Sequence, residues 1–127
     1  MPHALLIDDN QDNLDVLTQL LELEGVDVTR INHPARLDSV LEIDAGFDVV
    51  FIDLEMPHRN GYEVMAHLRQ HNSTAQAAMV AYTVHISEIG TVRDKGFDGF
   101  IGKPVNADEF PQELQNILNG QAVWSLP

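Results

Sequence analysis

The chain contains no cysteine, so a disulfide framework and a thiolate nucleophile or metal ligand are both excluded. This absence fits a reducing compartment. No apolar run approaches the ~20 residues that a membrane span needs, and the run at 4–7 is too short for the apolar core of a signal peptide. We therefore expect a cytoplasmic protein that does not cross a membrane.

Basic residues are also scarce: 7 lysines and arginines stand against 20 aspartates and glutamates, which gives a formal net charge of −13. This acidic balance argues against direct binding of nucleic acid or of an anionic membrane surface. The 127 residues, 44% of them hydrophobic, suffice for one domain with one core. We assign residues 1–120 to this domain and 121–127 to a short C-terminal tail, in which Trp124 packs back on the surface or meets a partner.

Short apolar runs and helical stripes alternate five times along the chain. The pattern predicts strands at 4–7, 26–31, 48–53, 77–83 and within 97–102, and helices at 14–23, 34–43, 61–71, 86–95 and 107–118. Such repetition implies a parallel sheet with right-handed crossovers and helices on both faces. The alternating strand 26–31 belongs near a sheet edge, and the uninterrupted apolar strand 48–53 belongs in the centre.

Polar side chains follow four of the predicted strands. In open α/β sheets, ligands bind just outside the carboxyl ends of the strands, and parallel strands place all these ends on one edge. We therefore expect side chains that are far apart in the sequence to converge there, namely Asp8, Asp9, Asp53, Thr83 and Lys103.

Three crowded carboxylates repel one another and raise one another's pKa values unless a cation joins them. A hard divalent ion with oxygen ligands, Mg²⁺ or Mn²⁺, is the expected partner. Lys103 can contact phosphate oxygens, and Thr83 offers a hydroxyl donor. A carboxylate, a metal, a lysine and a hydroxyl together indicate phosphoryl transfer onto an aspartate.

Four short motifs stand at these strand ends: Leu6-Ile7-Asp8-Asp9-Asn10, Asp53-Leu54-Glu55-Met56-Pro57 with Gly61, Val80-Ala81-Tyr82-Thr83, and Gly102-Lys103-Pro104. With these motifs the sequence resembles a receiver domain of a two-component response regulator over about residues 4–118. The resemblance implies a chemotaxis-receiver-like α/β fold: a single doubly wound (βα)5, flavodoxin-like sandwich with five parallel strands in the order 2-1-3-4-5.

The resemblance also assigns roles to the site residues. Asp53 matches the phosphoacceptor, which a histidine kinase or a histidine phosphotransfer protein phosphorylates. Asp9 and Asp53 match direct Mg²⁺ ligands, and Asp8 matches the acid that holds metal-bound water. The backbone carbonyl of Glu55 matches a further metal ligand. Lys103 matches the lysine that pairs with the acyl phosphate.

The matched switch residues are Thr83, whose hydroxyl moves toward the phosphoryl group, and Phe100, the aromatic residue behind it. A plain core role for Phe100 is the alternative. Pro104 matches a proline that follows a cis peptide bond. The added charge is expected to bias a protein-interaction surface formed by the last helix, the fifth strand and the helix before that strand. An unknown downstream protein, or a second copy of the chain in a homodimer, would bind this surface.

Three positions are expected to modulate the chemistry. Val84 follows Thr83, where the family usually has a smaller residue, and its branched side chain could narrow access to Asp53 or oppose the switch. Glu55 and His85 occupy variable positions that, by resemblance, tune the lifetime of the phosphoryl group. We expect a phosphoacceptor rather than an enzyme.

Three other functions remain open. The segment 53–55 resembles the acid-x-acid motif of haloacid-dehalogenase-type phosphatases, although the chain lacks a cap domain. A flavodoxin-like FMN protein needs a phosphate loop rich in Ser, Thr and Gly, where this chain has Asp8 and Asp9. A receiver-like interaction module that is never phosphorylated is supported only by Val84.

Overall fold

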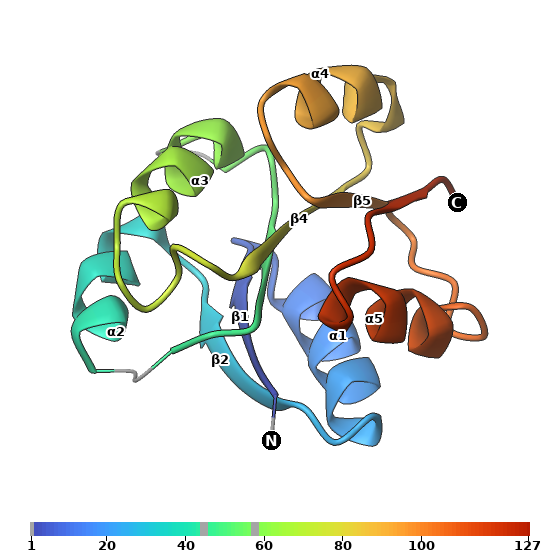
Figure 1. The fold of residues 1–127 in the computed structure, drawn as a ribbon, viewed down its shortest axis with the longest axis horizontal. Helices are drawn as coiled ribbons and strands as arrows, with labels where there is room; N and C mark the ends of the chain where they lie inside the picture. Colours follow the sequence, from blue (N-terminus) through green and yellow to red (C-terminus); the bar gives the residue numbers. More distant parts are fainter. Residues whose placement is uncertain (1, 44–45, 57–58) are drawn as a thin grey trace.

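A parallel sheet with helices on both faces forms the centre of the computed structural model, which describes residues 2–43, 46–56 and 59–127 (Figure 1). Pro57 of the second motif lies outside the described residues. In chain order the elements are β1 (His3–Ile7), α1 (Gln11–Leu23), β2 (Asp27–Ile31), a 3₁₀ turn (Pro34–Arg36), α2 (Leu37–Ile43), β3 (Val49–Ile52), α3 (Gly61–Arg69), β4 (Ala78–Thr83), a 3₁₀ turn (Ile86–Glu88), α4 (Ile89–Asp94), β5 (Gly99–Gly102), α5 (Phe110–Leu118) and β6 (Val123–Ser125).

The strand order within the described residues is β2-β1-β3-β4-β5-β6, and every neighbouring pair is parallel. The predicted order of the first five strands is confirmed, with β2 at an edge and β3 in the centre. The predicted count of five strands was wrong, because residues 123–125 of the tail add a sixth strand beside β5. Three residues are too few to show a period of two in a sequence.

Two hydrophobic clusters fill the two sides of the sheet, because successive strand residues point to opposite faces. On one side, Leu5, Val50 and Met79 pack against α2, α3 and α4. On the other side, Leu6 and Phe51 pack against α1 and α5 (Figure 1). Both faces of the sheet are therefore covered, which fixes the strands that deliver the polar residues.

Two helices begin next to the carboxyl ends of the strands. Asn10 caps α1, since its side-chain oxygen accepts the backbone N–H of Asn13 at 3.0 Å. Asn60 caps α3 in the same way, accepting from the N–H of Glu63 at 2.9 Å. These caps satisfy backbone donors that the first helical turn leaves free, so the loops between strand and helix are held at both ends.

The last helix begins at Phe110, three residues later than the sequence pattern predicted. The reason is a turn around Asn106, whose side-chain oxygen accepts the N–H groups of Asp108 at 2.9 Å and Glu109 at 3.2 Å. Asparagine favours such local side-chain-to-backbone bonds over helix. Similarly, the region predicted as one helix at 86–95 divides into a 3₁₀ turn and the short α4.

Candidate functional site

The backbone carries the predicted polar residues to one edge of the sheet, as expected from the parallel strands. Asp53 continues β3, donating its N–H to the carbonyl of Ile7 at 2.9 Å. Lys103 continues β5, donating to the carbonyl of Thr83 at 2.8 Å. Asp8 continues β1 in the same manner, next to β2. These ladder bonds set the positions of the side chains through rigid strands rather than through loops.

Three of the carboxylates form one acidic cluster. Asp8, Asp9 and Asp53 each offer an oxygen, and these atoms all lie within 4.8 Å of one another. Asp8 and Asp53 are buried, whereas Asp9 is exposed. Burial raises the pKa of Asp53 to about 6, with the charges of Asp8 and Asp9 adding to the rise and Lys103 opposing it. Asp53 therefore stays mainly ionised at neutral pH, at an energetic cost that a cation would relieve.

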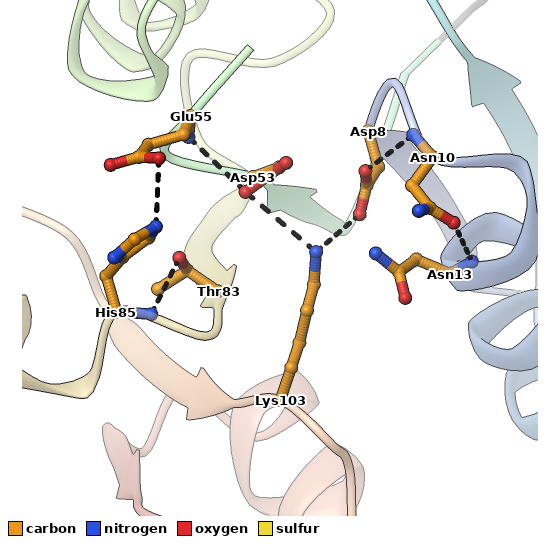
Figure 2. Close-up of polar contacts among 8 residues, drawn as sticks. All are labelled: Asp8, Asn10, Asn13, Asp53, Glu55, Thr83, His85 and Lys103. Atoms are coloured by element: carbon orange, nitrogen blue, oxygen red, sulfur yellow. Dashed lines mark hydrogen bonds and ion pairs between the residues drawn. The ribbon is translucent and has the colours of Figure 1, made fainter.

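Lys103 is the cation that the fold itself supplies to this cluster (Figure 2). Its ammonium group lies 2.7 Å from Asp8 Oδ2 and 3.9 Å from Asp53 Oδ1. The Lys103 side chain also passes over the ring of Tyr82, with the nitrogen 4.8 Å from the ring centroid. Tyr82 was not predicted as a site residue, although it stands directly before Thr83 in the motif Val80-Ala81-Tyr82-Thr83. Its pKa is raised to about 12 by burial and by the charge of Asp8, so the phenol stays protonated.

Thr83 ends β4, and its side chain is fully buried near Asp53 (Figure 2). Its hydroxyl oxygen accepts the backbone N–H of His85 at 3.2 Å. Phe100 is also fully buried, in the cluster on the α2–α4 side of the sheet. The structure thus places both predicted switch residues in the core behind the site; their switching role stays a prediction.

Glu55 and His85 contact each other on the side of Asp53 that faces away from Asp8 (Figure 2). His85 Nε2 lies 2.9 Å from Glu55 Oε2, and both side chains are substantially exposed. The backbone N–H of Glu55 donates to Asp53 Oδ1 at 3.3 Å, which ties this loop to the acceptor carboxylate. Both residues were predicted to modulate the chemistry, but their contact was not predicted, since 30 positions separate them.

Val84 exposes 60% of its surface, so most of its branched side chain faces solvent. The peptide bond between Lys103 and Pro104 is cis, as the resemblance predicted. Gly61 is required by a close approach, because a Cβ there would lie 2.6 Å from the Asp53 carbonyl oxygen and 2.8 Å from Leu54 Cα. Any side chain at Gly61 would therefore push α3 away from the strand end that carries Asp53.

The donor set of the acidic cluster fits a hard divalent cation. All its ligand atoms are oxygens, and two of the three carboxylates belong to buried side chains that only one lysine neutralises. Mg²⁺ prefers such oxygen ligands and retains several waters, for which the exposed side of the cluster at Asp9 leaves room. Among the described residues, no helix is long and apolar enough to cross a membrane.

This strand order, with an acidic cluster beside a buried lysine at the carboxyl edge, is that of a receiver domain. The chain belongs to the response regulator receiver domain family, whose family model matches residues 4–115. This membership favours the receiver interpretation over the phosphatase and FMN alternatives, and it makes the chain a module of two-component signalling.

Curated relatives and solved structures agree with this assignment. The transcriptional regulatory protein CpxR of Escherichia coli is 31% identical over 127 residues, which cover 98% of this chain and 52% of CpxR. Hybrid signal transduction histidine kinase L of Dictyostelium discoideum is 27% identical over 119 residues, covering 88% of this chain and 7% of the kinase. The chain thus spans about half the length of CpxR and a small part of the kinase.

The fold is shared with the Vibrio cholerae chemotaxis protein CheY4, with a TM-score of 0.81, 20% identity and coverage of 92% of this chain and 98% of CheY4. A putative response regulator from Chloroflexus aurantiacus has a TM-score of 0.80 and 25% identity, with 94% of this chain and 99% of that chain covered.

Proposed function

We propose that the chain accepts a phosphoryl group on Asp53 from a phosphohistidine of a partner histidine kinase or histidine phosphotransfer protein. An ionised oxygen of Asp53 attacks the phosphorus, a P–O bond forms, and the P–N bond to the histidine breaks. The electron pair of that bond stays on the imidazole nitrogen, which then takes a proton from water. The Asp53 carboxylate has reach to the open side of the site and remains ionised at neutral pH, as this step requires.

We assign Lys103 to stabilise the negative charge on the transferring phosphoryl oxygens. Its ammonium stands between Asp8 and Asp53 at 2.7 and 3.9 Å, and this placement is the observation that carries the proposal. The nitrogen needs only a small displacement to contact an oxygen bound to Asp53. A buried lysine in this position stabilises negative charge more strongly than it would in water. The buried hydroxyl of Thr83 offers a second donor.

Asp8, Asp9, Asp53 and the backbone carbonyl of Glu55 are the residues that we assign to a bound Mg²⁺ or Mn²⁺. When bound, the ion supplies positive charge next to the reacting oxygens. Asp9 is the exposed member of the cluster, so it gives the ion a route in from solvent.

The same proposal implies which partners the chain has and where in the cell it acts. The phosphoryl donor is a cytoplasmic kinase or phosphotransfer domain, and an unknown downstream protein binds the phosphorylated form. The chain assists its own phosphorylation and dephosphorylation and turns over no separate substrate. The formal charge of −13 supports an output through protein contacts rather than through nucleic acid.

Intact mass after incubation with acetyl phosphate and Mg²⁺ tests the proposal. We expect one added phosphoryl group in the unaltered chain, and none in Asp53→Asn or with a chelator in place of Mg²⁺. Asp12→Asn is the matched control, because Asp12 is an exposed aspartate of α1 outside the cluster, and it should be phosphorylated normally.

Other results would point elsewhere. Continuous release of phosphate without an adduct would mean either an Asp-nucleophile phosphatase or a very short-lived acyl phosphate, which binding of beryllofluoride would separate. No adduct, no release and no beryllofluoride binding would identify a receiver-like module that is never phosphorylated. An adduct that persists in Asp53→Asn would disprove Asp53 as the acceptor.

A further inference from the structure

The C-terminal tail covers the edge of β5 as a strand of the same sheet. Figure 1 shows the end of the chain running beside β5. The register pairs Gly99 with Val123, Phe100 with Trp124 and Ile101 with Ser125. Residues 121–127, called the strap below, therefore lie directly against the strand that leads to Lys103.

Trp124 is the main side-chain anchor of the strap. It is half-buried and packs against the hydrophobic cluster that contains the fully buried Phe100. The guanidinium carbon of Arg93 in α4 lies 4.6 Å from the centroid of the Trp124 ring. Such a cation–π contact attracts the guanidinium to the face of the ring and stabilises the pair. One tryptophan thus joins the strap to both β5 and α4.

The end of the strap reaches the site side of β5. A Cβ built on Gly102 would lie 2.5 Å from Pro127 Cδ and 3.1 Å from Ile86 Cγ2. Pro127 and Ile86 therefore both pack on the bare backbone of Gly102, one residue before Lys103. Ile86 belongs to the segment 84–86 that follows Thr83, so the strap and this segment share the surface of Gly102 beside the phosphoryl site.

The contacts of Thr83 supply a link between the site and this surface. Its hydroxyl oxygen accepts the His85 N–H at 3.2 Å, while within the described residues its proton has no recorded acceptor. A phosphoryl group on Asp53 adds strong acceptor oxygens nearby. If the Thr83 side chain turns toward those oxygens, its own oxygen moves away from the His85 N–H, and segment 84–86 is then released to move. Ile86 would leave the surface of Gly102 that it shares with Pro127.

We propose that docking of the strap on β5 and α4 is coupled negatively to occupation of the Asp53 site, so that phosphorylation loosens the strap and exposes the β5 edge. This inference rests on the proposed phosphoacceptor function. Because coupling between two sites is reciprocal, loss of the docked strap must tighten binding at Asp53, by at most the coupling factor.

The test measures the affinity of beryllofluoride, with Mg²⁺ present, by calorimetry in four proteins. We expect Trp124→Ala to bind about fivefold more tightly than the unaltered chain, which is the lower end of typical couplings, and Arg93→Gln about twofold more tightly. Lys95→Gln is the matched control: it removes one positive charge next to α4 without a recorded contact to Trp124, and it should leave the affinity unchanged. Equal or weaker binding in Trp124→Ala would overturn the proposal.

A second measurement does not depend on the fold of a variant. Trp124 is the single tryptophan of the chain, so its fluorescence reports the strap alone. Beryllofluoride should shift its emission to longer wavelength and speed amide hydrogen exchange at 122–126. If calorimetry shows binding while both signals stay constant, the coupling is disproved and the phosphoacceptor function stands. If the unaltered chain binds no beryllofluoride, the proposed function fails, and the strap proposal fails with it.

Discussion

Lys103 lies closer to Asp8 than to the proposed acceptor Asp53: its nitrogen is 2.7 Å from Asp8 Oδ2 and 3.9 Å from Asp53 Oδ1. The lysine thus neutralises a buried carboxylate of the acidic cluster. A divalent cation bound to this cluster would supply a substitute charge for Asp8 and would leave Lys103 free to turn toward Asp53. A bound cation and the lysine would thus share the same acidic cluster.

Lys103→Met should destabilise the metal-free protein by about 3 kcal/mol, because it leaves buried carboxylates without their cation. Mg²⁺ should restore much of this loss, so the rise in Tm on adding Mg²⁺ should be larger in the variant than in the unaltered chain. Lys95→Met, at the other lysine of the chain, is the control and should change neither Tm nor its response to Mg²⁺. An equal Mg²⁺ response in Lys103→Met and the unaltered chain would contradict the shared-cluster interpretation.

The raised pKa of Asp53 predicts how the metal-free stability depends on pH. Burial raises this pKa from 3.8 to about 6 in the folded chain. Between these values the folded state binds more protons than the unfolded state, so this group lowers the stability as pH rises from about 4 to 6. Asp53→Asn removes that loss and should be more stable than the unaltered chain at pH 7 by about 1–2 kcal/mol, or roughly 3–8 °C in Tm.

Thermal unfolding in chelator at pH 4 and pH 7 measures this difference. At pH 4 the advantage of Asp53→Asn should be small, since Asp53 is then largely protonated in the folded chain. With Mg²⁺ at pH 7 the advantage should shrink or reverse, because the ion stabilises only the protein that can bind it. Parallel pH curves for the two proteins would show that Asp53 is not destabilised by burial.

Gly61→Ala should disturb the site although Gly61 contributes no side chain to it. The added Cβ would lie 2.6 Å from the Asp53 carbonyl oxygen, so α3 or the strand end must shift. We expect a loss of about 1–3 kcal/mol in unfolding free energy, together with weaker Mg²⁺ binding. Gly90→Ala is the control, since nothing lies within 4 Å of a Cβ built there in α4 and alanine favours helix. Normal stability and Mg²⁺ affinity in Gly61→Ala would contradict the close approach.

Sequence patterns that lie within a single strand or helix predicted most of this fold and of the candidate site. The apolar run before Asp53 and the Gly102-Lys103-Pro104 motif each mark a strand end, and parallel topology then brings the marked residues together. Such patterns do not encode contacts between distant surface side chains, so the bridge from Glu55 to His85 was not foreseen. The strand within the strap was missed, because its pairing depends on the finished edge of β5 rather than on its own three residues.

The bridge between Glu55 and His85 predicts a shared effect on the lifetime of the phosphoryl group. The two side chains meet at 2.9 Å close to Asp53, and within the described residues neither side chain has another hydrogen-bond or ion-pair partner. Removing either partner should let water reach the phosphoryl group more freely and shorten its half-life. An exposed contact of this kind is worth about 0.2–1 kcal/mol, so we expect a change of about 1.4- to fivefold.

Glu55→Ala, His85→Ala and the double variant test this prediction when each is phosphorylated, freed of donor and followed by intact mass. Because each single substitution already breaks the bridge, the double variant should lose its phosphoryl group no faster than the faster single variant. Effects that multiply in the double variant would mean that the two residues act independently. A longer half-life in either single variant would mean that its side chain promotes the attack of water, and the bridge would then serve to restrain it rather than to shield Asp53.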